Sequence, residues 1–285
     1  MYGGVALAIA VYAAFAIIPT IGNVVISVTD YTAIPGASTD FVGLKNYKNL
    51  FTSQLPAFLA SLSATLVFVL GVTLSQNVLA LMFAHRLADG TRSADILRVL
   101  VFLPIVLGVT VVGLIWLVMF DPTNGPAARI LGVFGVHSSF FGSTEWAMPL
   151  VIVVQVWQNL GFTMLLYIGA LKAVPVSVYE ASSLDGATGW TRFRSITWPL
   201  LAPSVTVSLV YAVVGTLTTY NLIYVLTNGQ YGTETLGMLA FHSAFGRTAN
   251  LGLGAAVTTS LIVITVFVAI PLAVLLRWRE RRILG

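Results

Sequence analysis

The sequence has no cysteine and few charged residues. Only 8% of its 285 residues are Asp, Glu, Lys or Arg, against about a quarter in an average soluble protein. The absence of cysteine excludes disulfides, thiolate metal sites and a cysteine nucleophile. In contrast, 58% of the residues are hydrophobic and the mean hydropathy is +0.94. This composition indicates a membrane protein.

A basic patch of the kind that binds nucleic acid is also missing. The formal net charge is +4 and the pI is near 9.5. However, the basic residues lie at the ends of apolar stretches, without the clustering and interleaved aromatic residues expected of a nucleic-acid site. We therefore expect no nucleic-acid partner and interpret these charges as signals of membrane topology.

Six apolar stretches are long enough to cross a membrane, which requires about 20 residues in a helix. They predict an all-α membrane protein with about six transmembrane helices, forming a single domain over residues 1–285. The approximate spans are 2–28, 56–84, 99–120, 147–171, 203–226 and 251–276.

The basic residues between these spans are distributed unequally. Ten lie after the second and fourth spans and in the C-terminal tail: Arg86, Arg92, Arg98, Lys172, Arg192, Arg194, Arg277, Arg279, Arg281 and Arg282. Four lie on the other side: Lys45, Lys48, Arg129 and Arg247. Because basic loops stay in the cytoplasm, we predict that both termini are cytoplasmic. The acidic residues, Asp89 among them, divide evenly and do not bear on this assignment.

No charged residue lies near the centre of a predicted span. Ion-coupled carriers usually keep ionisable groups at membrane depth, although backbone carbonyls and hydroxyls can also hold Na⁺. A chain without such groups that moves a solute uphill is expected to draw energy from another subunit. It has no GxxxxGK[ST] loop of its own to bind ATP.

The predicted cytoplasmic loop, residues 172–202, has the pattern of a helix, a turn and a helix. Ser177 and Glu180 have the spacing of a capping box, which predicts a short helix over 178–184. Gly186 permits a left-handed turn, and a second helical stretch follows. Apolar side chains recur along the loop, yet an ordinary connecting loop with solvated acidic residues remains an alternative.

The sequence between Pro175 and Pro203 resembles the EAA loop of permease subunits of bacterial binding-protein-dependent ABC importers. Nine positions match in one register: Glu180, Ala181, Asp185, Gly186, Ala187, Phe193, Ile196, Pro199 and Pro203. Ser182 stands in place of the second Ala, and Trp198 in place of the usual Leu.

Further segments resemble the carbohydrate type of these permeases, in particular the maltose-F and glycerol-phosphate-A subunits. They are residues 41–47, 103–104, 113–116, 224–229, 244–245 and 252–256. Gln230 and Tyr231 replace the Gly-Pro usual in that family.

The resemblance implies several partners in the bacterial inner membrane and around it. They are a second, similar permease, two ATPase subunits or domains that carry ATP and Mg²⁺, and an external binding protein or lipoprotein. This chain would bind no cofactor and catalyse no reaction. The expected ATPase-coupling residues are Tyr179, Glu180, Ala181, Leu184, Asp185, Gly186 and Ala187.

Neutral polar residues inside the spans are candidates for a solute path. Helical spacing places these residues on shared faces: Thr73, Gln76 and Asn77; Gln155, Gln158 and Asn159; and Tyr220 and Tyr224 with Asn221 adjacent. Amides and aromatic rings suit a neutral sugar or polyol. The alternative is that the amides join helices, at about 0.6 kcal/mol per contact.

Three other functions are less compatible with the sequence. An intramembrane enzyme would need a nucleophile and base, paired carboxylates or metal ligands at membrane depth, and the three histidines lack metal-ligand spacing. A permease for amino acids, phosphate or peptides remains open. A stand-alone channel would not need a docking loop.

Overall fold

The computed structural model describes residues 2–32, 34, 38–88, 90–246 and 249–284. Asp89 and Arg247, which entered the charge comparison, lie outside the described residues. The described chain is almost entirely helical, and its β pairing is limited to one isolated bridge between Thr29 and Phe41. The all-α prediction is therefore confirmed.

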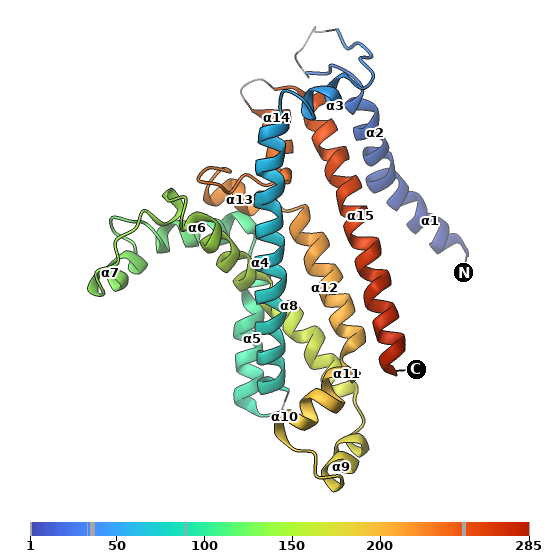
Figure 1. Cartoon of the computed structure of the whole chain (residues 1–285), viewed down its shortest axis with the longest axis vertical. Coiled ribbons are helices and arrows are strands. Elements are labelled where there is room, and N and C mark those ends of the chain that lie inside the picture. The colour runs from blue at the N-terminus through green and yellow to red at the C-terminus, as the bar shows by residue number, and fades with distance from the viewer. Residues whose placement is uncertain (1, 33, 35–37, 89, 247–248, 285) are drawn as a thin grey trace. The chain divides into compact units, whose positions relative to one another are not determined.

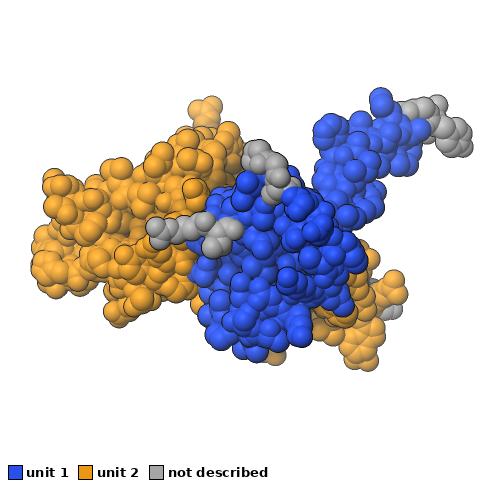
Figure 2. Space-filling view, turned by 90° about the horizontal axis from the view of Figure 1, so that it is seen from above, with its two compact units in different colours: residues 1–65, 234–265 blue, residues 66–233, 266–285 orange. Residues whose placement is uncertain are grey.

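The chain forms two compact units, coloured separately in Figure 2. Unit 1 comprises Met1–Thr65 and Glu234–Thr265, and unit 2 comprises Leu66–Thr233 and Val266–Gly285. The two longest helices, α4 (Leu55–Leu87) and α15 (Leu251–Leu284), each contribute residues to both units.

Four helical segments of the described chain are long and apolar enough to cross a membrane: Val5–Ser27, Leu55–Leu87, Ala147–Ala173 and Leu251–Ile283. They correspond to the first, second, fourth and sixth predicted spans. The first consists of α1 (Tyr2–Tyr12), a π-helical turn (Ala13–Ile17) and α2 (Ile18–Ser27), and the third is α8 (Ala147–Ala173). With 33 residues, α4 is about 50 Å long, well beyond the hydrocarbon core of about 30 Å.

The third predicted span, residues 99–120, is wrong as a single helix. It divides into α5 (Arg92–Val106) and α6 (Val109–Met119), which are bent by 104° (Figure 1). Pro104 has no N–H to donate within α5, and both Leu107 and Gly108 adopt extended conformations, with ψ of 138° and 142°. The helical hydrogen-bond pattern therefore stops between the two helices.

The fifth predicted span, residues 203–226, is also interrupted. Helix α12 (Ala202–Leu217) ends before α13 (Asn221–Leu226) begins. The hydroxyls of Thr218 and Thr219 donate to the carbonyl of Gly215 at 3.2 and 2.8 Å. Such side-chain bonds compete with the backbone pattern of a helix. A second bend, of 69°, separates Gly189–Leu200 from α12.

Unit 1 is held together by α3 (Lys45–Leu50), α14 (Leu236–Phe245) and the adjoining parts of α2, α4 and α15. The buried Asn46 amide donates to the carbonyls of Ser27 and Thr29 at 2.9 and 2.7 Å, which satisfies the end of α2. The Tyr47 hydroxyl lies 2.7 Å from the Ser27 hydroxyl. The segment after the first span therefore anchors that span. The short helix α14, which also belongs to unit 1, was not predicted from the sequence.

The core of unit 2 lies where α4, α5, α8 and α12 meet. Its buried side chains include Ala84, Met164, Tyr167 and Leu201. Helices α5 and α8 pack so closely that a Cβ at Gly161 would overlap the backbone of residues 101–102. The remaining elements of this unit, α7 (Pro126–Val133) and a 3-10 turn (Phe140–Gly142), lie between α6 and α8 in the chain.

Candidate functional site

The loop between α8 and α12 forms the predicted helix, turn and helix. Helix α9 (Val176–Leu184) is followed by α10 (Gly189–Arg192), a π-helical turn (Phe193–Thr197) and α11 (Trp198–Leu200). Figure 1 shows α9 and α10 at one end of unit 2, beyond the end of α8. A compact helical element therefore projects from the bundle instead of an irregular loop.

Gly186 ends α9 in the predicted left-handed conformation, with φ of +75°. The Gly186 N–H donates to the Ser183 carbonyl at 3.2 Å, and the Ala187 N–H donates to the Ser182 carbonyl at 2.9 Å. This pair of bonds is a Schellman motif, which satisfies carbonyls at a helix end. The turn after α9 therefore has one defined geometry.

The capping box predicted for Ser177 and Glu180 is wrong. The helix begins earlier, and Pro175 occupies the N-cap position without a side-chain cap. Ser177 is thus already the second helical residue, where its hydroxyl cannot cap the first turn. The Glu180 side chain is exposed, and no hydrogen bond or ion pair to the described residues involves its carboxylate.

Most of the predicted coupling residues are on the surface. Leu184, the last residue of α9, is 90% exposed. Glu180, Ala181, Asp185 and Gly186 are also exposed, whereas Tyr179 and Ala187 are half-buried. An exposed leucine therefore lies beside small residues and two carboxylates at the end of α9.

Arg192 joins the two arms of this element, which the sequence did not indicate. Its Nε donates to the Ala187 carbonyl at 3.2 Å, and a terminal nitrogen donates to the Ser183 hydroxyl at 3.1 Å. The next residue, Phe193, lies edge-on to His85 of α4, with ring centroids 6.0 Å apart. The turn is therefore braced by the second arm, which in turn contacts α4.

The three polar residues of α4 share one buried face, as their spacing predicted. Gln76 donates to the Thr163 hydroxyl at 2.6 Å. Asn77 donates to the Thr73 carbonyl at 2.8 Å, and its Oδ1 accepts hydrogen bonds from the hydroxyls of Tyr167, at 2.8 Å, and Ser208. These contacts join α4 to α8 and α12.

The polar residues of α8 lie beside the α5–α6 break. The Gln158 amide donates at 3.3 Å to the Leu107 carbonyl, which has lost its helical partner. Asn159 donates to the Gln155 carbonyl at 3.0 Å, and both of these residues remain partly exposed. Gln158 therefore stabilises the break that the sequence did not reveal.

Tyr220, Asn221 and Tyr224 belong to the separate helix α13. The tyrosines are one turn apart, since the Tyr224 N–H donates to the Tyr220 carbonyl at 2.8 Å. Their side chains are 42% and 48% exposed. Helix α13 contacts α6 and α8.

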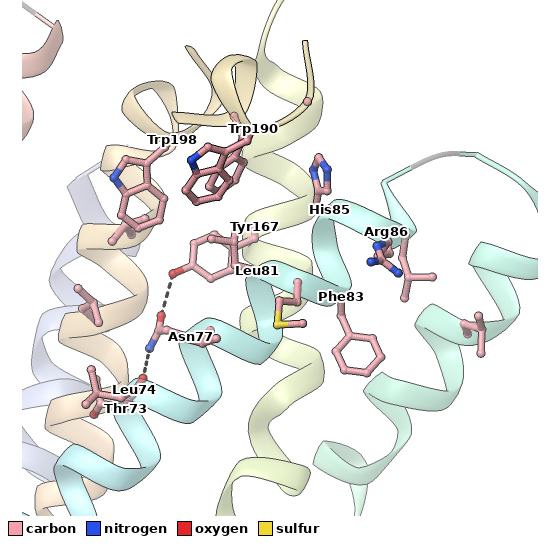
Figure 3. Close-up of a pocket in the computed structure, with 18 of the residues that line it drawn as sticks. Thr73, Leu74, Asn77, Leu81, Phe83, His85, Arg86, Tyr167, Trp190 and Trp198 are labelled. Carbon is pink, nitrogen blue, oxygen red and sulfur yellow. Dashed lines mark hydrogen bonds between the residues drawn. The ribbon is translucent and has the colours of Figure 1, made fainter. Parts of the chain in front are cut away.

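A cavity of about 910 Å³ opens in unit 2 beside α10 and α11 (Figure 3). Its walls are mainly apolar and come from α4, α8, α10, α12 and α15. Figure 3 shows Trp190, Trp198 and His85 at one end, and Thr73 and Leu74 at the other. In the part of the chain that the structure describes, no cluster of three His, Asp or Glu side chains could hold a metal ion.

Comparison with known proteins places this architecture in a family. The profile of "Binding-protein-dependent transport system inner membrane component" matches residues 76–285. The chain belongs to this family. It is therefore a multi-pass inner membrane permease component of a transport system and not an enzyme, as the resemblance of the EAA loop implied.

Similar proteins agree with this assignment. The chain is 32% identical to the sn-glycerol-3-phosphate transport system permease protein UgpA of Agrobacterium fabrum, over 87% of this chain and 84% of that protein. It is also 32% identical to the trehalose/maltose transport system permease protein MalF of Thermococcus litoralis, over 86% and 82%.

A solved structure has the same fold. A chain of a bacterial alginate ABC transporter, in complex with an alginate pentasaccharide-bound periplasmic protein, aligns with a TM-score of 0.81 at 20% identity. The alignment covers 99% of the permease and 94% of that chain.

Proposed function

We propose that the permease forms half of the translocation path of an ATP-driven importer, and that α9 with its turn is the element that docks on an ATPase. The observation that carries this proposal is the defined helical turn with an exposed Leu184. A rigid-body movement passes through a braced element better than through a flexible one. Arg192 and the Gly186 turn supply that bracing.

The partners follow from this arrangement. Two ATPase subunits or domains would bind ATP and Mg²⁺, a second similar permease would complete the path, and an external binding protein or lipoprotein would deliver the solute. The apolar first span supports a partner or lipid around it, because none of its central residues is buried within the chain. We further infer that both termini, α9 and α10 face the cytoplasm of a bacterium.

The proposed cargo is a sugar, polyol or related solute. The named substrates of the relatives, trehalose, maltose and glycerol phosphate, support this class. The spans also present neutral amides and aromatic rings, which suit hydroxyl groups and the apolar face of a sugar ring. Tyr220, Asn221 and Tyr224 with Gln155 and Asn159 are the accessible candidates.

The other polar residues of the predicted path have a supporting role in this proposal. Gln76, Asn77 and Gln158 are buried and hydrogen-bonded to neighbouring helices, and Thr73 is buried beside them. They would hold the helices around the solute. A different solute class remains the alternative, and transport assays with sugars and amino acids would distinguish the two.

The docking proposal predicts a loss of assembly when the surface of α9 is changed. Leu184→Arg and Glu180→Arg alter exposed side chains, so we expect the chain to fold and insert normally while association with the ATPase falls at least tenfold. Gly186→Pro, which is incompatible with φ of +75°, should have the same effect. Co-purification of the permease pair with the ATPase measures this.

The matched control is Val133→Arg, which introduces the same side chain at an exposed position in α7, outside the loop. It should leave association unchanged. Normal assembly and normal transport by all three loop variants would show that α9 is not the docking element.

A further inference from the structure

The cavity in unit 2 has the dimensions of a binding site. Its volume of about 910 Å³ is within the range of about 300–1,000 Å³ typical of small-molecule sites. Along α4 its lining residues run from Thr73 to Leu87, which corresponds to about 21 Å of helix. This length is sufficient to cross one leaflet, which is half of a hydrocarbon core about 30 Å thick.

Its two ends differ in character. The deep end is walled by aliphatic side chains such as Leu74, Val78 and Leu209, together with the hydrogen-bonded Asn77 and Tyr167 and with Thr73. The end beside α10 and α11 carries Arg86 and Arg279. No Asp or Glu is among the described residues that line the cavity, so its outer end is positively charged.

The charged end is also built from aromatic rings. The Arg279 guanidinium lies 5.9 Å from the centroid of the Trp198 ring, a distance at which a cation and a ring attract. Trp190 stacks on Phe193, with centroids 5.4 Å apart. Tryptophan and arginine together are typical of the boundary between hydrocarbon and lipid headgroups.

We propose that this cavity binds an anionic phospholipid, with its headgroup at Arg86 and Arg279 and an acyl chain along α4 towards Leu74. Basic pockets between transmembrane helices on the cytoplasmic side commonly hold anionic lipid headgroups. The inference rests on the proposed function in two respects, the cytoplasmic leaflet and the docking role of α9.

The bound lipid would act on the docking element. Trp190 and Phe193, which line the cavity, belong to the arm that follows the Gly186 turn. A lipid against these rings would fill the space behind that arm. Removing the lipid is expected to leave α9 less firmly held. Coupling between the permease and the ATPase should then decrease.

The test uses the assembled transporter in phosphatidylcholine nanodiscs containing phosphatidylglycerol with a photoactivatable acyl chain. Peptide mapping after illumination should place adducts within residues 74–87 and 189–209. The double variant Arg86→Gln/Arg279→Gln should lower the adduct yield roughly thirtyfold, as expected for two basic residues near an anionic headgroup. Val78→Trp, which fills the cavity without changing its charge, should also lower it.

The control pair Arg92→Gln/Arg281→Gln removes the same amount of charge from the same proposed side of the membrane. It should leave the adduct yield unchanged. An equal loss in both pairs, adducts outside these segments, or a crosslink from Val78→Cys to the second permease in place of lipid would overturn the proposal. Co-purification of the ATPase is measured on the same samples, so that a failure of assembly is separated from a failure of lipid binding.

Discussion

At the scale of single residues, Asn77 connects three helices. Its Oδ1 accepts from the hydroxyls of Tyr167 on α8 and Ser208 on α12, while its amide donates to the Thr73 carbonyl within α4. A buried amide with its hydrogen bonds made within the protein is poorly available to a passing solute. Asn77 is therefore better suited to holding the three helices together than to contacting the transported solute.

Replacing Asn77 tests this role. Asn77→Leu removes the acceptor of both hydroxyls, and membrane hydrogen bonds contribute about 0.6 kcal/mol each, so we expect a loss of about 1–2 kcal/mol in the free energy of unfolding. Tyr167→Phe removes one of these hydrogen bonds, so its loss in the free energy of unfolding should be smaller. Unfolding in mixed micelles with increasing SDS measures both variants.

The double variant provides the control for this pair. If the two residues interact, Asn77→Leu/Tyr167→Phe loses less than the sum of the single losses. Strictly additive losses would mean that Asn77 and Tyr167 do not interact. Unchanged stability with impaired transport would instead favour direct contact between Asn77 and the solute.

Two properties of single residues could be predicted from the sequence only in part. The spacing of Ser177 and Glu180 fits a capping box, but Pro175 can precede a helix directly because its fixed φ suits that position. The helix therefore begins too early for Ser177 to cap it. Likewise, the spacing of Thr73, Gln76 and Asn77 identified their common face, but the hydrogen-bond partners come from distant segments and could not be read locally.

At the scale of elements, α8 was predicted well because it is predominantly apolar along its length and its polar residues, Gln155, Gln158 and Asn159, do not interrupt the helix. The α5–α6 break was missed because membrane helices tolerate proline when neighbouring groups satisfy the freed backbone, and here that neighbour is Gln158, 51 residues further along the chain. The gap after α12 was missed for a related reason, since threonine is compatible with an apolar span. Composition identifies a span but does not show where its backbone stops being helical.

The packing of α8 on α5 predicts that two glycine-to-alanine substitutions in α8 have opposite effects on stability. Gly161 faces the backbone of residues 101–102, whereas Gly169 on the same helix has no atom within 4 Å of an added Cβ. Gly161→Ala should destabilise the protein by about 1–3 kcal/mol through overpacking. Gly169→Ala should stabilise it by up to about 1 kcal/mol through helix propensity.

Thermal unfolding of the two variants in the same detergent compares these effects. Stabilisation by both substitutions would mean that α5 and α8 are not in close contact. The pair is matched, since both substitutions add one methyl group to the same helix.

At the scale of the whole molecule, the charge distribution predicts the orientation in the membrane. Ten of the basic residues are assigned to one side and four to the other, and basic loops are retained in the cytoplasm. This orientation is essential to the proposed function, because a docking element can reach an ATPase only from the cytoplasm. The orientation would also decide which leaflet supplies the proposed phospholipid.

Single cysteines give a direct measurement, because the chain has none of its own. Thr188→Cys lies in the turn between α9 and α10, and Thr123→Cys lies between α6 and α7, with both side chains exposed. In intact cells a membrane-impermeant maleimide should label Thr123→Cys and not Thr188→Cys, and in inside-out vesicles the pattern should be reversed. Labelling of Thr188→Cys from outside would contradict the assigned orientation, because α9 would then be separated from any ATPase by the membrane.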